Sequence, residues 1–414
     1  MKKDKITLTL ILLSTLLISG YASHNQELVE SDDLDRLEAA LDSFDKALQL
    51  KRADHQAWNN RGVALMDLGR LEAALNSFDK ALQFKPDYHQ AWYNRSIALI
   101  DLGRLEAALD SFDKALRFKP DNHKAWYARG VALMDLGRLE AAIESFDKAL
   151  QFKPDYHQAW SNRGVALINL GRLEVAIESF DKALLLKPDD HQAWSNRGVA
   201  LMDLGRLEAA IESFDKALQL KPDYHQAWYN RSIALMDLGR LEAALDSFDK
   251  ALRFKPDKHK AWYARGVALM DLGRLEAAIE SFDKALQFKP DYHQAWYNRS
   301  IALMDLGHLE AALNSFDKAL QLKQDYPQAW SNRGVALMDL GRLEAALDSF
   351  DKALQLKPDD HQAWNNRGVA LMDLGHLEAA LDSFDKALQL KPDDHQAWNN
   401  RGVALMDLGH LEAA

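Results

Sequence analysis

Serine, histidine and aspartate could together form a hydrolase-type catalytic site in this chain. Ser111, Asp121 and His123 lie close together, but each belongs to a segment that returns at a fixed interval along most of the sequence. An active site is a single concave place where unlike residues converge. A residue that occurs once in every copy of a repeat indicates architecture instead, so we expect no catalytic site and a protein that is not an enzyme.

The 14 histidines could in principle bind a metal ion. Ten of them occupy one place in the repeated segment, as His89 and His157 do, so successive copies are too widely spaced to share one ion. Three others, His308, His376 and His410, replace an arginine, and no HxxxH or HxxE pair accompanies them. We therefore expect helix-start and turn residues, with no metal site and no cofactor.

The composition excludes further classes of function. The chain has no cysteine, which rules out disulfides, thiol catalysis and zinc–thiolate sites. Its formal net charge is −11, and a negative surface repels nucleic acid phosphates, so we expect no nucleic acid partner.

A fixed period of 34 residues organises the whole sequence. It is marked by all 11 tryptophans, which follow one another at that interval: Trp58, Trp92, Trp126, Trp160, Trp194, Trp228, Trp262, Trp296, Trp330, Trp364 and Trp398. Such a period indicates a stacked array of small structural units, in which each unit buries its apolar surface against its neighbours.

Each unit is predicted to be a helical hairpin. We number its positions from 1, at the histidine, so that the tryptophan is position 4. Trp92 and Leu99 belong to one apolar stripe at helical spacing, and a second stripe that includes Phe112 follows Gly103. Glycine tolerates the positive φ of a helix C-cap, and proline at position 32 ends the second helix. Asp121, at position 33, is the expected N-cap of the next helix.

The pattern resembles the tetratricopeptide repeat (TPR) family. The family motif is W-x2-L-G-x2-Y, then A-x3-F, then P, and the first full copy matches it at Trp58, Gly62, Ala74, Phe78 and Pro86. Arg61 and Leu65 depart from the family's leucine and tyrosine in every copy. The resemblance covers residues 35–414 and implies an all-α, right-handed superhelical solenoid of antiparallel helix pairs. The first helix of each pair would line a concave groove.

Residues 1–22 resemble a bacterial signal peptide. Lysines 2, 3 and 5 precede an apolar run, and small residues at 20 and 22 favour cleavage after Ala22. We expect export to the periplasm, the cell surface or the medium, and the alternative is an uncleaved N-terminal membrane anchor. Residues 23–34 read as a polar lead-in.

The repeats begin with a partial copy, 35–54, that supplies only a second helix. Ten complete copies occupy 55–394, and a truncated copy occupies 395–414. The truncation is expected to leave Trp398, Val403 and Leu411 without packing partners. Self-association through that end is therefore one hypothesis.

The candidate binding site is the face of the first helices opposite Trp at position 4. Positions 2, 5, 9, 12 and 13 gather there, and position 6 adds a row of asparagines. Across three repeats the candidate residues are Asn162, Val165, Asn196, Val199, Met202, Asp203, Tyr229, Asn230, Ile233, Met236 and Asp237. The apolar stripe at 9 and 12 has three interpretations. It forms a peptide groove, it packs inside a tightly wound superhelix, or it reflects duplication without selection.

Asparagine recurs at position 6 in nine of the copies. Such a row can pair with the backbone of an extended peptide, since each amide offers a donor and an acceptor. The resemblance implies this use, because some TPR proteins have an asparagine ladder, while the alternative is a set of helix-surface amides. The lysine and asparagine of the TPR carboxylate clamp are missing at positions 5 and 9. Aspartate at 13 instead favours apolar or basic segments.

Arginine occupies position 7 in all 11 copies. A half-buried guanidinium needs a carboxylate partner, and Asp at position 25 of the preceding repeat is the expected one. This pair predicts a structural link between repeats.

These observations favour a non-catalytic scaffold that binds extended or helical peptide segments of an unidentified protein in the TPR groove. One alternative is a structural solenoid that self-associates through its C-terminal end. Another is the regulatory TPR arm of a longer protein.

Overall fold

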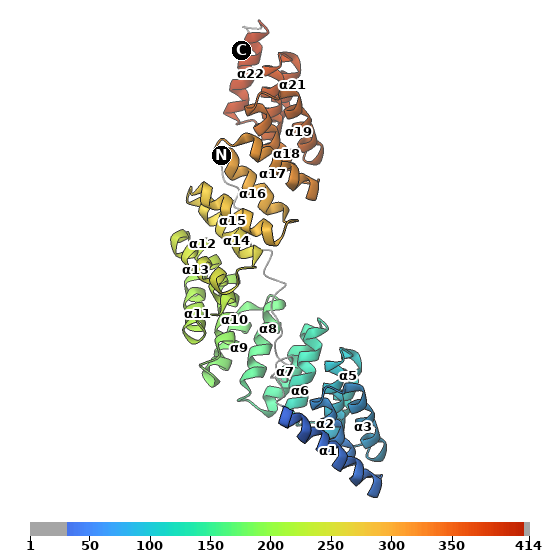
Figure 1. Ribbon diagram of the computed structural model, residues 1–414. Coiled ribbons are helices and arrows are strands. Elements are labelled where there is room, and N and C mark those ends of the chain that lie inside the picture. Colours follow the sequence, from blue (N-terminus) through green and yellow to red (C-terminus); the bar gives the residue numbers. More distant parts are fainter. Residues whose placement is uncertain (1–30, 410–414) are drawn as a thin grey trace. The chain divides into compact units, whose positions relative to one another are not determined.

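The computed structural model describes residues 31–409, and every regular element in that range is an α-helix (Figure 1). The helices are α1 (Ser31–Leu50), α2 (His55–Asp67), α3 (Leu71–Phe84), α4 (His89–Asp101), α5 (Leu105–Phe118), α6 (His123–Asp135), α7 (Leu139–Phe152), α8 (His157–Asn169), α9 (Leu173–Leu186), α10 (His191–Asp203), α11 (Leu207–Leu220), α12 (His225–Asp237), α13 (Leu241–Phe254), α14 (His259–Asp271), α15 (Leu275–Phe288), α16 (His293–Asp305), α17 (Leu309–Leu322), α18 (Pro327–Asp339), α19 (Leu343–Leu356), α20 (His361–Asp373), α21 (Leu377–Leu390) and α22 (His395–Asp407).

The helices pack in consecutive pairs, which confirms the all-α solenoid. The even-numbered helix of each pair is its first helix, and it contacts the odd-numbered helix that follows it. The chain divides into two units at Pro222 and Asp223, and pairs stack on their neighbours in the same way within each unit. Each unit therefore builds its core from many small, similar contacts.

A glycine turn joins the two helices of a pair. Gly103 has a φ of +72°, and its N–H bonds the carbonyl of Ile100 at 2.8 Å. The N–H of Arg104 bonds the carbonyl of Leu99, also at 2.8 Å. This pair of bonds is the Schellman motif, which satisfies the last carbonyls of the first helix and reverses the chain.

The start of the first helix differs from the expectation at position 33. The N-cap is position 34, and Asn122 rather than Asp121 accepts a hydrogen bond from the N–H of Ala125 at 3.3 Å. Asp54 does the same for Gln56 and Ala57. Tyrosine at this position makes no side-chain cap.

Phenylalanine at position 24 forms the centre of every hairpin. Phe214 is fully buried, and so are its equivalents in the other complete repeats. A Cβ added at Gly198 would lie 2.6 Å from Phe214 Cε1, so glycine at position 8 allows the ring to approach the first helix closely. Seven of the ten complete repeats have this glycine, and the ring is equally buried in the three that have serine, at Ser96, Ser232 and Ser300.

Arginine at position 7 links neighbouring repeats, as expected. Arg197 Nε lies 2.7 Å from Asp181 Oδ1 of the preceding repeat, and Nη1 donates to Ser213 Oγ at 2.8 Å. The guanidinium carbon lies 5.9 Å from the ring centre of Trp194, whose indole N–H bonds the carbonyl of Pro188 at 2.9 Å. The guanidinium therefore joins two repeats through one side chain.

The first and last described helices can be compared with the domain boundaries expected from the sequence. Helix α1 begins at Ser31, so it includes residues 31–34 of the segment expected as a lead-in. The expected signal peptide lies outside the described residues. Within residues 31–409, no helix has both the length and the apolar character that a membrane crossing demands. Trp398 and Val403 are 53% and 40% exposed, while Leu411 is not among the described residues.

Candidate functional site

The first helices line one continuous face in each unit. In the first unit α2 contacts α4, α4 contacts α6, α6 contacts α8 and α8 contacts α10, and the same holds from α12 to α22 in the second. The predicted site residues from Asn162 to Asp203 belong to the first unit, and those from Tyr229 to Asp237 to the second.

Much of the predicted apolar stripe is buried. Val165, Val199, Met202 and Ile233 are only 6–8% exposed, while Met236 is half-buried. At the same positions of the seventh to tenth repeats, the side chains are half-buried: Val267, Met270, Ile301, Met304, Val335, Met338, Val369 and Met372. The apolar surface open to a ligand is therefore larger from α14 to α20 than at the stripe residues predicted from the sequence.

The predicted polar residues lie in two kinds of place. Asp203 and Asp237 are exposed, although partial desolvation by the surrounding protein raises the pKa of Asp203. The ring of Tyr229 packs at 6.1 Å from that of Phe248, and burial raises its pKa to about 12. Asn230 is 3% exposed and accepts a hydrogen bond from the Gln226 amide at 3.1 Å.

The asparagine row at position 6 is partly occupied by the chain itself. Asn162 Nδ2 donates to the hydroxyl of Tyr127 at 3.0 Å, and Asn298 donates to that of Tyr263 at 2.9 Å. The acceptor is position 5 of the preceding repeat each time, and an asparagine there serves equally, as where Asn94 donates to Asn59 Oδ1 at 3.0 Å. These amides therefore join successive first helices.

Two asparagines of the row are left open. Asn196 and Asn366 follow repeats with serine at position 5, Ser161 and Ser331. Serine is shorter than tyrosine or asparagine, and no hydrogen bond joins either asparagine side chain to another residue in the described part of the chain. Both are half-buried between helices. They present unpaired amide donors and acceptors on the first-helix face.

A tyrosine cluster beside this row was missed by the sequence reasoning. The ring of Tyr127 lies 4.9 Å from that of Tyr156, and His123 meets Tyr156 edge to face at 5.6 Å. Burial raises the pKa of Tyr127 to about 12 and lowers the pKa of His123. Tyrosine at 34 in one repeat together with tyrosine at 5 in that repeat was the available signal.

The histidines otherwise lie where the sequence predicts. His89 and His157 begin α4 and α8, and His308 and His376 lie in hairpin turns just before α17 and α21. His410 lies outside the described residues. Between residues 31 and 409 there is no group of three or more histidine, aspartate or glutamate side chains placed to hold a metal ion.

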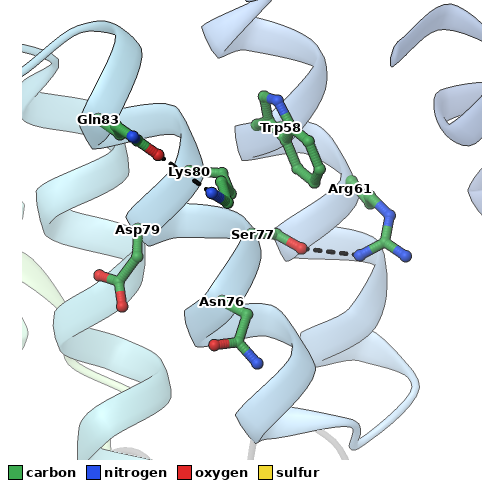
Figure 2. Close-up of a pocket in the computed structure, with 7 residues that line it drawn as sticks. All are labelled: Trp58, Arg61, Asn76, Ser77, Asp79, Lys80 and Gln83. Atoms are coloured by element: carbon green, nitrogen blue, oxygen red, sulfur yellow. Dashed lines mark hydrogen bonds between the residues drawn. The ribbon is translucent and has the colours of Figure 1, made fainter. Parts of the chain in front are cut away.

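A pocket of a second kind is lined by residues of both helices of a repeat, including the tryptophan at position 4. It is formed by positions 4, 7, 22, 23, 25, 26 and 29 of one repeat, and Figure 2 shows the copy lined by Trp58, Arg61, Asn76, Ser77, Asp79, Lys80 and Gln83. Its volume is about 340 Å³, and an equivalent pocket of about 370 Å³ beside Trp296 uses the same seven positions.

Comparison with family models identifies the repeats. Two models described as tetratricopeptide repeat match the chain. One matches residues 77–123, 93–157, 161–225, 196–259, 229–293 and 297–361, and the other matches 55–88 and 361–394. No curated protein matches the chain.

Solved structures of TPR proteins resemble parts of it. YrrB, described as a TPR protein with an unusual peptide-binding site, is 28% identical over 45% of this chain and 96% of its own, with a TM-score of 0.42. MamA from Desulfovibrio magneticus RS-1 is 23% identical over 41% of this chain and 96% of its own, with a TM-score of 0.40. A TPR protein from Parabacteroides merdae is 19% identical over 60% and 98%, with a TM-score of 0.44.

The family models together match residues 55–394 except for 158–160 and 294–296, and so reach all ten complete repeats. TPR proteins are generally non-catalytic, and their stacked hairpins present surfaces to other proteins. The chain therefore belongs to the tetratricopeptide repeat family and has the build of a protein–protein interaction scaffold.

Proposed function

We propose that the protein binds an extended or helical peptide segment of a partner protein along the face of its first helices, without catalysing a reaction. The observation that carries this proposal is an open amide in each unit, Asn196 in the first and Asn366 in the second. Half-buried polar groups normally find partners, and an amide that offers both donor and acceptor suits a peptide backbone. The partly exposed Val, Ile and Met side chains of α14–α20 would add adaptable apolar contact.

The negative charge at the edge of this face indicates which charge the bound peptide segment should carry. Asp203 and Asp237 edge the apolar stripe, as does aspartate at position 13 of every other repeat except the fourth, which has Asn169. A carboxylate edge repels acidic peptides and attracts basic ones. We therefore expect the bound segment to be apolar with basic residues, and not an acidic C-terminus.

A peptide library displayed on beads tests the proposal directly. The full chain is compared with a double variant, Asn196→Ala with Asn366→Ala, which removes the open amides and no internal hydrogen bond. Peptides held by the first protein and lost by the second, with the same melting temperature, would support the proposal. Equal retention by both proteins would show that the open amides do not contribute to peptide binding.

A matched control uses the closed amides. Asn162→Ala with Asn298→Ala removes two asparagines that already bond Tyr127 and Tyr263. This variant should melt at a lower temperature and still bind at temperatures where it is folded. Loss of binding only in this control would mean that the face acts through its geometry rather than through the open amides.

We also propose that residues 1–22 direct export and are removed after Ala22. Mass spectrometry of the protein from fractionated cells of a bacterial expression host gives the mature N-terminus. A mass that starts at Ser23, in a periplasmic or secreted fraction, supports this proposal. An intact N-terminus in a membrane fraction supports the uncleaved anchor instead.

A further inference from the structure

One position distinguishes the repeats that hold the pockets beside Trp58 and Trp296 from the other eight complete repeats. Asparagine occupies position 22 in these two complete repeats, as Asn76 and Asn314, and aspartate or glutamate occupies it in the other eight. Neither asparagine side chain hydrogen-bonds another residue in the range 31–409, and both are exposed. Each pocket therefore has a neutral, open amide where its counterparts carry a negative charge.

A lysine one helical turn further on supplies the charge of the pocket. Lys80 Nζ donates to the neutral oxygen of Gln83 at 3.1 Å, and Lys318 donates to Gln321 at 3.5 Å. Neither ammonium group pairs with a carboxylate within the described residues. The nearby acid and base, Asp79 and Arg61, are already paired with the adjacent repeats. Lysine thus supplies the unpaired charge of the pocket.

The side chain at position 29 distinguishes two placements of the lysine at position 26. In six repeats with glutamine there, lysine at 26 bonds the glutamine, as in the repeats of Lys80 and Lys318. In the two repeats where arginine replaces glutamine, the lysine lies over the tryptophan instead, with Lys114 Nζ only 4.3 Å from the ring centre of Trp92. Lys250 covers Trp228 in the same way, also at 4.3 Å. With glutamine, no lysine lies over the indole beside the pocket, and the nearest cation is the position-7 arginine, whose guanidinium carbon lies 5.9 Å from the ring centre of Trp58 and 5.8 Å from that of Trp296.

From this arrangement we propose that the pockets of Trp58 and Trp296 bind acidic aromatic peptide segments. The carboxylate pairs with Lys80 or Lys318, the open amide of Asn76 or Asn314 donates to it, and the aromatic ring stacks on the indole. Volumes of about 340 and 370 Å³ suit one such side-chain pair rather than a whole domain. The site shares no position with the first-helix face, so it stands or falls independently of the proposed function.

The chemistry of the site sets its preference. An ammonium group and an amide both donate hydrogen bonds to a carboxylate, and a flat ring offset over an indole gains further from stacking. A carboxylate at position 22 would place a like charge about one helical turn from the ligand, which weakens binding roughly threefold in water. The other repeats carry that carboxylate, so only two repeats of the ten should bind.

Fluorine NMR of the full chain labelled with 5-fluorotryptophan tests this site, because each indole then reports separately. Trp58→Phe and Trp296→Phe assign two of the resonances. The probe is acetyl-Phe-Glu-amide, with acetyl-Phe-Gln-amide and acetyl-Phe-Lys-amide as neutral and basic comparisons. We expect the Trp58 and Trp296 resonances to shift most, and the acidic probe to bind at least threefold more tightly than the neutral one. Equal shifts at all indoles, or tighter binding of the basic probe, would overturn the proposal.

Three variants at exposed positions sharpen the test, and unchanged melting confirms their fold. Asn76→Asp should weaken the response of Trp58 about threefold and leave that of Trp296 unchanged. Gln83→Arg should drive Lys80 over Trp58 and abolish the response there. Glu280→Asn, in a repeat whose Lys284 already bonds Gln287 at 3.3 Å, should create a third responsive indole at Trp262. Failure of this gain together with no loss in Asn76→Asp would refute the role of position 22.

Discussion

Arg197 and Asp181 lie in successive repeats and meet through one short contact, Nε to Oδ1 at 2.7 Å. The same pair of positions is joined at 2.6–2.8 Å at nine other junctions among the described residues. Arg197 is 24% exposed and Asp181 is 53% exposed, so water screens the pair only in part. Because the contact is repeated at each of these junctions, it indicates that the ion pair helps to hold neighbouring repeats together.

Replacing Arg197 by leucine should lower the free energy of unfolding by about 1–2 kcal/mol, because it removes the ion pair and leaves Ser213 Oγ without its donor. Peptide binding at the first-helix face should change little. Thermal melting and a binding titration on the same sample measure both. Arg197→Lys, which keeps the charge and loses the forked geometry, should lie between the two. A variant that melts normally but fails to bind would contradict the structural role.

Adding a methyl group at position 8 should have opposite effects at two sites. In Gly198→Ala the new Cβ would lie 2.6 Å from Phe214, so a fully buried ring must move, and we expect a loss of about 1 kcal/mol. In Gly402→Ala no atom lies within 4 Å, and the better helix propensity should raise stability by about 0.5–1 kcal/mol. Chemical denaturation of the two variants gives the comparison. Effects of the same sign would show that the ring does not limit this position.

Removing the amide of Asn162 should be more costly than removing that of Asn196. Asn162→Ala breaks a hydrogen bond to Tyr127 and should cost about 1 kcal/mol. Asn196→Ala breaks no hydrogen bond and should leave stability almost unchanged. A double-mutant cycle with Tyr127→Phe isolates the pair. Additive losses in that cycle would rule out the bond as the source of the difference.

The N-cap at Asp54 should make the stability of the first repeats depend on pH. The backbone N–H of Ala57 is the main reason why the pKa of Asp54 is lowered below 3.8. A lowered folded-state pKa means that the stabilisation is present above the unfolded value and is lost as the pH falls through the folded one. Asp54→Ala should therefore cost about 1 kcal/mol at pH 7. The two proteins should converge as the pH falls through the lowered pKa of Asp54, as melting curves at several pH values would show. A gap that persists at low pH would mean that the charge is not involved.

The sequence predicted those parts of the fold that depend on residues close together or on a strict period. Glycine turns, helix pairs and the arginine–aspartate link all follow from the 34-residue repeat. The N-cap was wrong by one residue, because Asp121 and Asn122 are both good caps and only the backbone geometry selects Asn122.

The candidate site was harder to predict. The partner of Asn162 lies 35 residues earlier, at Tyr127, and depends on the angle at which one repeat meets the next. The exposure of Val199 likewise depends on what packs over it, which no pattern within one helix reveals. The pockets beside Trp58 and Trp296 depend on where one lysine side chain lies, and that placement differs between repeats with glutamine and repeats with arginine one helical turn away.

The shared junction has a consequence for how such a chain can change its length. Because nearly identical side chains join each pair of neighbouring repeats within a unit, removing or inserting one 34-residue block places equivalent residues opposite each other again. The arginine, aspartate and tryptophan at the new junction are then equivalent to those at the original one. Unequal recombination in the gene can therefore change the number of repeats without a folding penalty at the point of exchange. The length of the scaffold then changes in steps of one repeat.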